Sequence, residues 1–232
     1  MTRNSRHGFT LLELLIVIAV IAILATIAYP VYIGIEERAK ATKDMNNLRQ
    51  IGIATQLYLN DNDSALFSTT GSWMTQLCPK YTAAWGIFQS PFDTRAPSEV
   101  GDATTPISYG INGTPGLIGI AVDKITKPTI FIMFAPAQTQ GAAVSFLGTA
   151  ATVSPYVTVL GIGGGQAKST PDGSAAIGGT QNNRTKINAL FADLHCETMP
   201  WGGAGVTFTN NTANPPSDPN GNLRWFPYIP YP

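Results

Sequence analysis

The chain has 232 residues, of which 44% are hydrophobic and only 12% are charged, whereas typical soluble domains carry about 25% charged residues. Its 14 lysines and arginines balance its 14 aspartates and glutamates, which argues against a protein that binds nucleic acid through a global basic field. The length allows one membrane-spanning element followed by one soluble domain with its own core.

The first predicted element is an apolar helix. Residues 1–8 are polar and basic, and residues 14–35 then contain no charged side chain. At about 1.5 Å per residue this run spans about 33 Å, enough to cross a bilayer. Because the basic flank comes first, we expect residues 1–8 in the cytoplasm and the rest of the chain outside it. A secretory signal peptide also starts with a basic flank, but its apolar stretch is only about 7–15 residues long. The longer run here therefore favours a membrane-spanning helix over a signal peptide.

A carboxylate, Glu13, stands at the start of this apolar run. A charge near the bilayer centre costs about 2.5–3.5 kcal/mol, so such a residue is a functional candidate. The segment GFTLLE (8–13) resembles the processing site of type IV pilins and of type II secretion pseudopilins. The resemblance implies cleavage between Gly8 and Phe9 by prepilin peptidase, N-methylation of Phe9, and a role of Glu13 in assembly. Pro30 falls where many pilins carry a helix-kinking proline.

Physical chemistry agrees with this resemblance. Cleavage would create a positive amine at Phe9, four residues from Glu13 and therefore on the same helical face. In a packed filament Glu13 could pair with the Phe9 amine of a neighbouring subunit, since an unpaired charge in a low dielectric is costly. The alternative is a plain membrane anchor with a tolerated glutamate near its edge.

The second half of the helix is predicted to be amphipathic. One helix is expected from about residue 10 to residue 59, bent or loosened near Pro30 and Gly34 and ended by the segment NDND (60–63). Apolar residues recur at helical spacing and should pack against a globular domain. The charged residues between 36 and 49, Asp44 among them, are expected to be solvated.

The rest of the chain, 61–232, is predicted to be an extracytoplasmic β-rich domain, so the fold class is α+β with an antiparallel sheet. The expected strands lie at 107–111, 116–122, 129–135, 156–162 and 186–192. Long exposed loops are expected at 91–106 and 161–186. The tail, 210–232, should be pinned to the domain by its aromatic residues Trp225, Phe226, Tyr228 and Tyr231. The expected domain order is thus leader 1–8, transmembrane or filament-core helix 9–35, amphipathic helix 36–60 and domain 61–232.

A second resemblance extends over the domain. The segments NLRQIGIATQLYLNDN (47–62), SPFDTR (90–95), SYGIN (108–112) and ALFADLHCE (189–197) resemble, in the same order, the motifs of a large bacterial family of type II secretion-like pseudopilins. Two positions depart from that family, with Ser90 in place of a frequent cysteine and Leu194 in place of a glycine. The second departure weakens the prediction of a tight hairpin, because two-residue turns favour Asp-Gly.

The two cysteines, Cys78 and Cys196, admit two interpretations. A disulfide that closed so long a loop could stabilise the fold by roughly 4–5 kcal/mol in the chain-entropy model. Alternatively both are buried thiols, and sequence alone does not give the distance between them.

Three segments contain residue types that occur in chemical sites. The first could be a metal site or a catalyst and consists of Asp193, His195, Cys196 and Glu197. Because neighbouring strand residues point to opposite faces, His195 and Cys196 cannot easily share one ion. The favoured interpretation is a turn-closing aspartate beside a half-exposed histidine. The glycine-rich segment 161–170 lacks the glycines of a phosphate-binding loop and is expected to be a flexible loop. In 217–222, Asp218 is a weak Ca²⁺ candidate, and a turn is favoured. We therefore expect no catalytic residue, no metal site and no cofactor.

The favoured function is structural: a processed subunit that forms a homo-oligomeric helical filament, either a type II secretion pseudopilus or, less favoured, a type IV pilus. The resemblance implies prepilin peptidase, an assembly platform and its ATPase as partners, and the bacterial inner membrane as the site of the single-pass precursor. No nucleic-acid partner is expected. The alternatives are a minor tip subunit that binds a substrate, a surface or DNA, and a membrane-anchored enzyme that uses His195.

Overall fold

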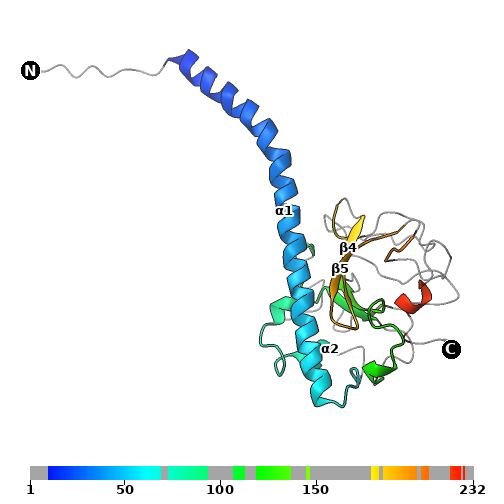
Figure 1. Cartoon of the computed structure of the whole chain (residues 1–232). Coiled ribbons are helices and arrows are strands. Elements are labelled where there is room, and N and C mark those ends of the chain that lie inside the picture. The colour runs from blue at the N-terminus through cyan, green and yellow to red at the C-terminus, as the bar shows by residue number, and fades with distance from the viewer. Residues whose placement is uncertain are drawn as a thin grey trace, which may run out of the picture. The chain divides into compact units, whose positions relative to one another are not determined.

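A computed structural model describes residues 10–68, 73–93, 107–112, 119–136, 145–146, 179–182, 185–202, 205–208, 220–225 and 227. A long helix, α1 (Leu11–Asp61), precedes a five-stranded sheet, so the predicted α+β class is confirmed (Figure 1). The chain divides into two compact units, Met1–Ala39 and Lys40–Pro232. The second half of α1 therefore belongs to the same compact unit as the sheet.

Helix α1 matches the prediction of one helix from about residue 10 to residue 59. It continues through Pro30 without a break. At its end the Asn62 side chain donates a hydrogen bond to the carbonyl of Tyr58 (2.7 Å), and Asp63 and Ser64 take positive φ values of 52° and 60°. These features satisfy exposed carbonyls and turn the chain away, as the polar segment 60–63 predicted.

The sheet has the strand order β3-β1-β2-β4-β5. Its strands are β1 (Tyr109–Asn112), β2 (Ile132–Pro136), β3 (Ser145–Phe146), β4 (Lys186–Phe191) and β5 (Cys196–Pro200). Four of them pair in the antiparallel manner that was predicted, whereas the two-residue β3 lies parallel to β1. Four short helical elements, α2 (Trp73–Leu77), η2 (Trp85–Phe88), η4 (Val122–Lys124) and η5 (Asn222–Arg224), complete the described fold.

The predicted strands are confirmed in part. Those expected at 107–111, 129–135 and 186–192 correspond to β1, β2 and β4, while 156–162 lies outside the described residues. The strand expected at 116–122 is wrong over its described part: Gly119 takes a left-handed φ of 67°, and Ala121 forms only an isolated bridge to Ala65 before η4 begins. Apolar composition suggested a strand there, but the left-handed glycine interrupts extended backbone.

The main core lies between α1 and one face of the sheet. Leu48, Ile51 and Ala54 from the helix are at most 1% exposed and pack with large side chains from α2, η2, β1 and β2. Among these, Trp73 lies 4.7 Å from Phe134, centroid to centroid. The predicted apolar stripe of the helix is therefore the face that holds the sheet.

A second, smaller core covers the opposite face of the sheet. Successive residues of β4 alternate between the two cores, as a pleated strand requires: Leu190 belongs to the main core, and Ala189 and Phe191 to the second. Trp225 from the tail is fully buried in this second core. The prediction that tail aromatics pin the tail to the domain is confirmed for Trp225; Phe226, Tyr228 and Tyr231 lie outside the described residues.

Candidate functional site

The helix begins with three hydrogen bonds between Thr10 and Glu13, in which each residue both donates and accepts. The Glu13 carboxylate accepts from the backbone N–H of Thr10 (2.8 Å) and from its hydroxyl (2.8 Å), and the Thr10 hydroxyl accepts from the backbone N–H of Glu13 (3.2 Å). This is a capping box, in which a threonine and a glutamate three residues later satisfy exposed donors of the first turn. The Thr-x-x-Glu spacing in the sequence could have revealed it, but the sequence analysis assigned Glu13 only to assembly. Gly8 and Phe9 lie outside the described residues.

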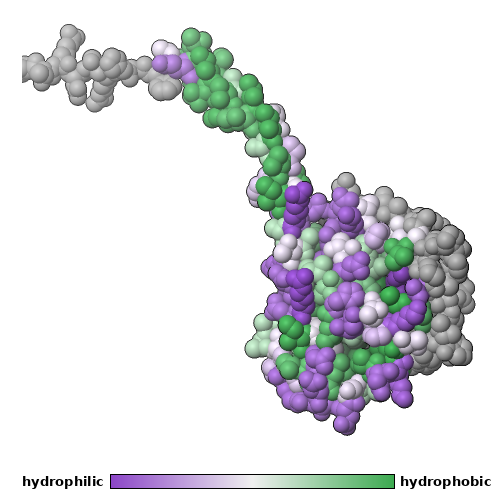
Figure 2. Space-filling view, in the orientation of Figure 1, coloured by the Kyte–Doolittle hydropathy of each residue, from purple (hydrophilic) through white to green (hydrophobic). Residues whose placement is uncertain are grey.

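The first half of α1 presents apolar side chains on all sides. Within the described residues, α1 is the one helix long and apolar enough to cross a membrane, judged by length and composition, and none of its most apolar window is buried. Figure 2 shows this continuous hydrophobic surface along the helix. Leu14 and Ile27, for example, are 58% and 66% exposed. A helix that is hydrophobic all round needs either lipid or other helices around it.

The second half of α1 carries a polar cluster that the sequence analysis missed. Asp44, expected to be solvated, is fully buried, which corrects that prediction. Its Oδ1 accepts hydrogen bonds from the hydroxyls of Ser90 (2.6 Å) and Tyr109 (2.6 Å), and its Oδ2 accepts one from the Asn188 side-chain amide (2.8 Å). These four residues, called the Asp44 node below, connect α1 to the loop after η2, to β1 and to β4.

Neighbouring bonds fix the amide of the node. Asn188 Nδ2 also donates to the backbone carbonyl of Ala41 (3.1 Å), and Asn188 Oδ1 accepts from the Thr198 hydroxyl of β5 (2.7 Å). One turn along α1, Asn47 Nδ2 donates to the Gln89 carbonyl (2.9 Å). The helix is therefore joined to both β4 and the loop after η2 by directional bonds in addition to apolar packing.

Burial dominates the electrostatics of the node. It raises the pKa of the Asp44 carboxyl above its ordinary value, although the hydrogen bonds from Ser90, Tyr109 and Asn188 oppose the shift. Burial, and then the nearby Asp44 charge, raise the pKa of the Tyr109 hydroxyl well above its ordinary value. Tyr109 therefore stays protonated and available as a donor at any physiological pH.

Signals for this cluster were present in the sequence. Asp44 stands four residues before Leu48 and seven before Ile51, which places it on the buried face of the helix. Ser90 and Tyr109 belong to the segments SPFDTR and SYGIN, which resemble family motifs. In this structure their hydroxyls converge on one buried acid. Ser90, which stands where that family often has cysteine, is thus a hydrogen-bond donor in this fold.

The N-terminal segment also matches a known motif. A comparison with protein-family models matches residues 3–29 to the prokaryotic N-terminal methylation motif. The chain carries a type IV pilin-like prepilin signature. The match covers the basic leader, the predicted cleavage site at Gly8 and Phe9, Glu13 and most of the apolar helix. No curated protein and no solved structure matches the chain.

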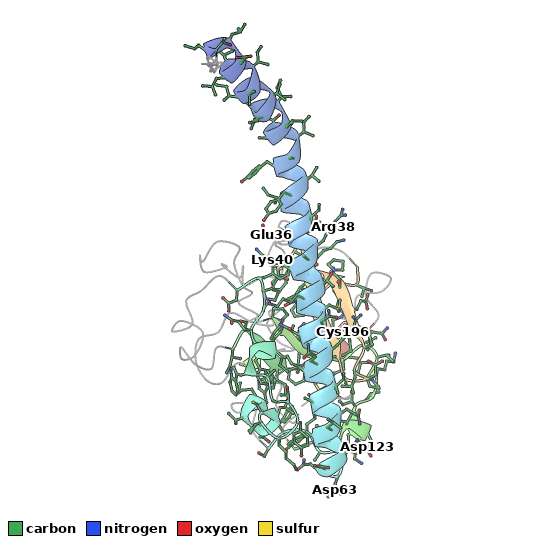
Figure 3. All side chains as sticks on the ribbon, turned by 90° about the vertical axis from the view of Figure 1, so that its left-hand side faces the viewer. Glu36, Arg38, Lys40, Asp63, Asp123 and Cys196 are labelled. Atoms are coloured by element: carbon green, nitrogen blue, oxygen red, sulfur yellow. The ribbon has the colours of Figure 1, made fainter. Side chains whose placement is uncertain are left out.

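The two cysteines are free in the structure, and both are half-buried. Cys78 directly follows α2, which is tied to the end of α1 by a hydrogen bond from the Tyr58 hydroxyl to Gln76 (3.0 Å). Cys196, labelled in Figure 3, instead lines a surface pocket together with Ile53 and Leu57 of α1. In this structure the two thiols are not bonded to each other. Burial is the main cause that raises the pKa of the Cys196 thiol to about 11, so this thiol is protonated at neutral pH.

Asp193 and His195 interact with each other in the turn between β4 and β5. Asp193 Oδ1 accepts from the backbone N–H of His195 (3.2 Å) and contacts its ring nitrogen Nδ1, while the imidazole stacks on Phe191 with 4.3 Å between ring centroids. Leu194 occupies the turn with φ of 68°. The hairpin therefore forms although a glycine is missing. Among the described residues no three metal-binding side chains cluster together.

The weak Ca²⁺ candidate, Asp218, lies outside the described residues, as does segment 161–170. The turn expected next to Asp218 is present at Asn220 and Gly221. There the Asn220 side chain accepts a hydrogen bond from Lys127 Nζ (2.7 Å), which ties this part of the tail to the domain.

Proposed function

We propose that the chain is a structural subunit that loses its leader and polymerises into a pilus-like or pseudopilus filament. The observation that carries the proposal is the methylation motif at residues 3–29, located at the start of an exposed apolar helix that leads into a folded domain. Cleavage between Gly8 and Phe9 keeps the helix attached, so the product would be an apolar helix joined to a folded domain. Residues 9–35 would pack against the same segment of other copies.

Glu13 would align neighbouring subunits. A carboxylate offers about four acceptor positions. Glu13 could therefore keep its hydrogen bonds to Thr10 and still accept a hydrogen bond from the Phe9 ammonium of a neighbouring subunit. In the low dielectric of a filament core an unpaired charge is costly, and pairing would favour one stagger between the helices. The apolar side chains around it supply the contact area, and the charge pair supplies the register.

We assign the precursor to the bacterial inner membrane, with residues 1–8 in the cytoplasm and the sheet domain outside it, on the basis of the basic leader and the positive-inside rule. Prepilin peptidase, an assembly platform and its ATPase would be its partners. We favour a type II secretion pseudopilus over a surface pilus, because the resemblance of the domain motifs points that way. Residues 61–232 carry eight basic and ten acidic residues, which does not favour a nucleic-acid partner.

We propose no catalytic role. The Asp193 carboxylate is engaged in closing the turn with His195, and the neighbouring Cys196 thiol is protonated and half-buried. A cysteine nucleophile needs its thiolate form, which this environment disfavours. The substitution His195→Ala should therefore leave assembly intact.

Mass spectrometry of the N-terminus of membrane-extracted protein tests this function. We expect a chain that begins at N-methylated Phe9, and a Gly8→Leu variant that retains Met1 or the residue after it and forms no filament. A Thr2→Ala variant, altered in the leader away from the cut, should be processed normally. A native chain that starts at Met1, or near Tyr29, would refute the proposed processing.

A further inference from the structure

The Asp44 node holds a buried acid without a cation bonded to it. Among the described residues, the groups that hydrogen-bond to its two oxygens are two hydroxyls and one amide, all neutral. In the part of the chain that the structure describes, the titratable side chains that interact with Asp44 are Tyr109 of β1 and Cys196 of β5. The cationic side chains nearest to it along α1 are Lys43, Lys40 one turn before it and Arg49, and none of them hydrogen-bonds to its carboxylate. The loop after η2 carries Asp93. Asp93 is engaged with the Ser108 hydroxyl (2.6 Å).

The bonding partners can accommodate either charge state of the acid. A hydroxyl both donates and accepts, so Ser90 and Tyr109 can donate to an ionised Oδ1 or receive a proton from a neutral carboxyl. The amide of Asn188 cannot exchange its roles in the same way, because Ala41 and Thr198 fix its orientation. Protonation of Asp44 at Oδ1 therefore needs rotation of hydroxyl hydrogens and no movement of the helix or the sheet.

We propose that Asp44 is a proton-operated lock between the second half of α1 and the sheet, which holds the two together more firmly when its carboxyl group is protonated than when it is ionised. The lock lies within the unit Lys40–Pro232 and does not depend on the proposed function. Its physical basis is that the ionised form loses its hydration on burial and gains only neutral donors in return.

The direction of the pH dependence follows from linkage. Because burial raises the pKa of Asp44, the folded chain binds this proton more tightly than the unfolded chain, whose aspartates titrate near pH 4. The contribution of Asp44 to the free energy of unfolding is therefore greatest below about pH 4. It falls as the pH rises through the folded-state pKa, and it is constant above it.

Urea unfolding of the full-length chain in detergent micelles tests the lock, with the fluorescence of the buried Trp73 and Trp225 as the signal. We compare the wild type, Asp44→Asn and the control Asp93→Asn between about pH 4 and pH 8. The wild-type midpoint should fall relative to that of Asp44→Asn as the pH rises, and Asp93→Asn should follow the wild type. Wild-type and Asp44→Asn midpoints that change in parallel across this range would overturn the proposal.

A direct titration keeps the proposal testable if Asp44→Asn does not fold, since its new amide would face the amide of Asn188. The ¹³C NMR shift of the Asp44 carboxyl carbon in the isotope-labelled wild type should titrate with a midpoint above pH 4, the usual value for aspartate being about 3.9. A midpoint at or below that value would show that the fold favours the ionised acid, and the lock would not exist.

Discussion

The side chain of Glu13 has one role in the structure and a second in the proposed filament. In the structure its carboxylate caps the first turn of α1 through Thr10, and in the proposed filament it also meets a neighbouring ammonium. The first role needs a hydrogen-bond acceptor, whereas the second needs a negative charge. Glutamine satisfies the first role and not the second, because a capping box accepts either residue. The two roles can therefore be separated by substitution.

The variants Glu13→Gln and Glu13→Ala should both insert into the membrane and be processed, but both should enter filaments poorly. Both lack the charge that would pair with the Phe9 ammonium. The measurement is the amount of sheared or extracted filament relative to the processed subunit.

Thr10→Ala is the matched control, because it weakens the cap by about 1 kcal/mol and keeps the charge. It should assemble nearly as well as the wild type. Normal assembly of Glu13→Gln, together with failure of Thr10→Ala, would assign Glu13 to capping alone.

Leu194 is a second residue under opposing demands. Its φ of 68° costs about 1–2 kcal/mol for a residue with a Cβ, yet its half-buried side chain packs against the main core. The packing explains why leucine is tolerated in a turn that favours glycine.

Replacement of Leu194 by alanine and by glycine separates the contribution of side-chain packing from the cost of the left-handed backbone conformation. Both variants lose the packing of the side chain, but only Leu194→Gly relieves the strain. Although glycine also makes the unfolded chain more flexible, Leu194→Gly should be more stable than Leu194→Ala by roughly 1 kcal/mol or less in urea unfolding. A glycine variant less stable than the alanine variant would show that the turn is not strained.

At the scale of elements, close contact between α1 and β4 sets the geometry of the domain. A Cβ added to Gly52 would lie 3.2 Å from Leu190 Cδ1 and 3.5 Å from Cδ2. The same pair of elements is joined by Asp44 and Asn188. Glycine thus permits the close approach, and the polar bond fixes its direction.

The substitution Gly52→Val should destabilise the domain by about 1–3 kcal/mol, because its methyl groups would push against a fully buried leucine. Thermal unfolding followed by near-ultraviolet circular dichroism measures this. Gln56→Val, on the exposed face of the same helix, should cost only a few tenths of a kcal/mol. Equal effects of the two variants would contradict close packing at Gly52.

Helix α1 could be predicted well from the sequence, because the patterns that indicate a helix involve residues close together in the chain. The uncharged run after Glu13 and the apolar stripe through Leu48 and Ile51 depend only on helical spacing, and three strands were found from β-rich runs. Helical spacing also places Asp44 on the buried face, but its hydrogen-bond partners could not be derived in this way, because they lie 46 to 144 residues away along the chain. β5 was missed because CETMP contains no run of β-rich apolar residues, and only its Met199 is buried at this edge of the sheet.

At the scale of the whole molecule, the two units suit different environments. The described part of the unit Met1–Ala39 exposes its apolar side chains, whereas the unit Lys40–Pro232 encloses two cores and mixes polar with apolar side chains on the face that Figure 2 shows. Lipid can cover the first unit before assembly, and helices of other copies can cover it afterwards. In our proposal, removal of the leader allows the apolar helix to leave the lipid and pack against the helices of other copies.

A cryo-electron microscopy structure of the assembled filament would show directly whether Glu13 pairs with the Phe9 ammonium of a neighbouring subunit. We predict that the apolar helices pack against one another and that the Phe9 ammonium lies within about 4 Å of the Glu13 carboxylate of a neighbouring copy. Helices that stay apart, or a Glu13 that faces water without a cationic partner, would contradict the account.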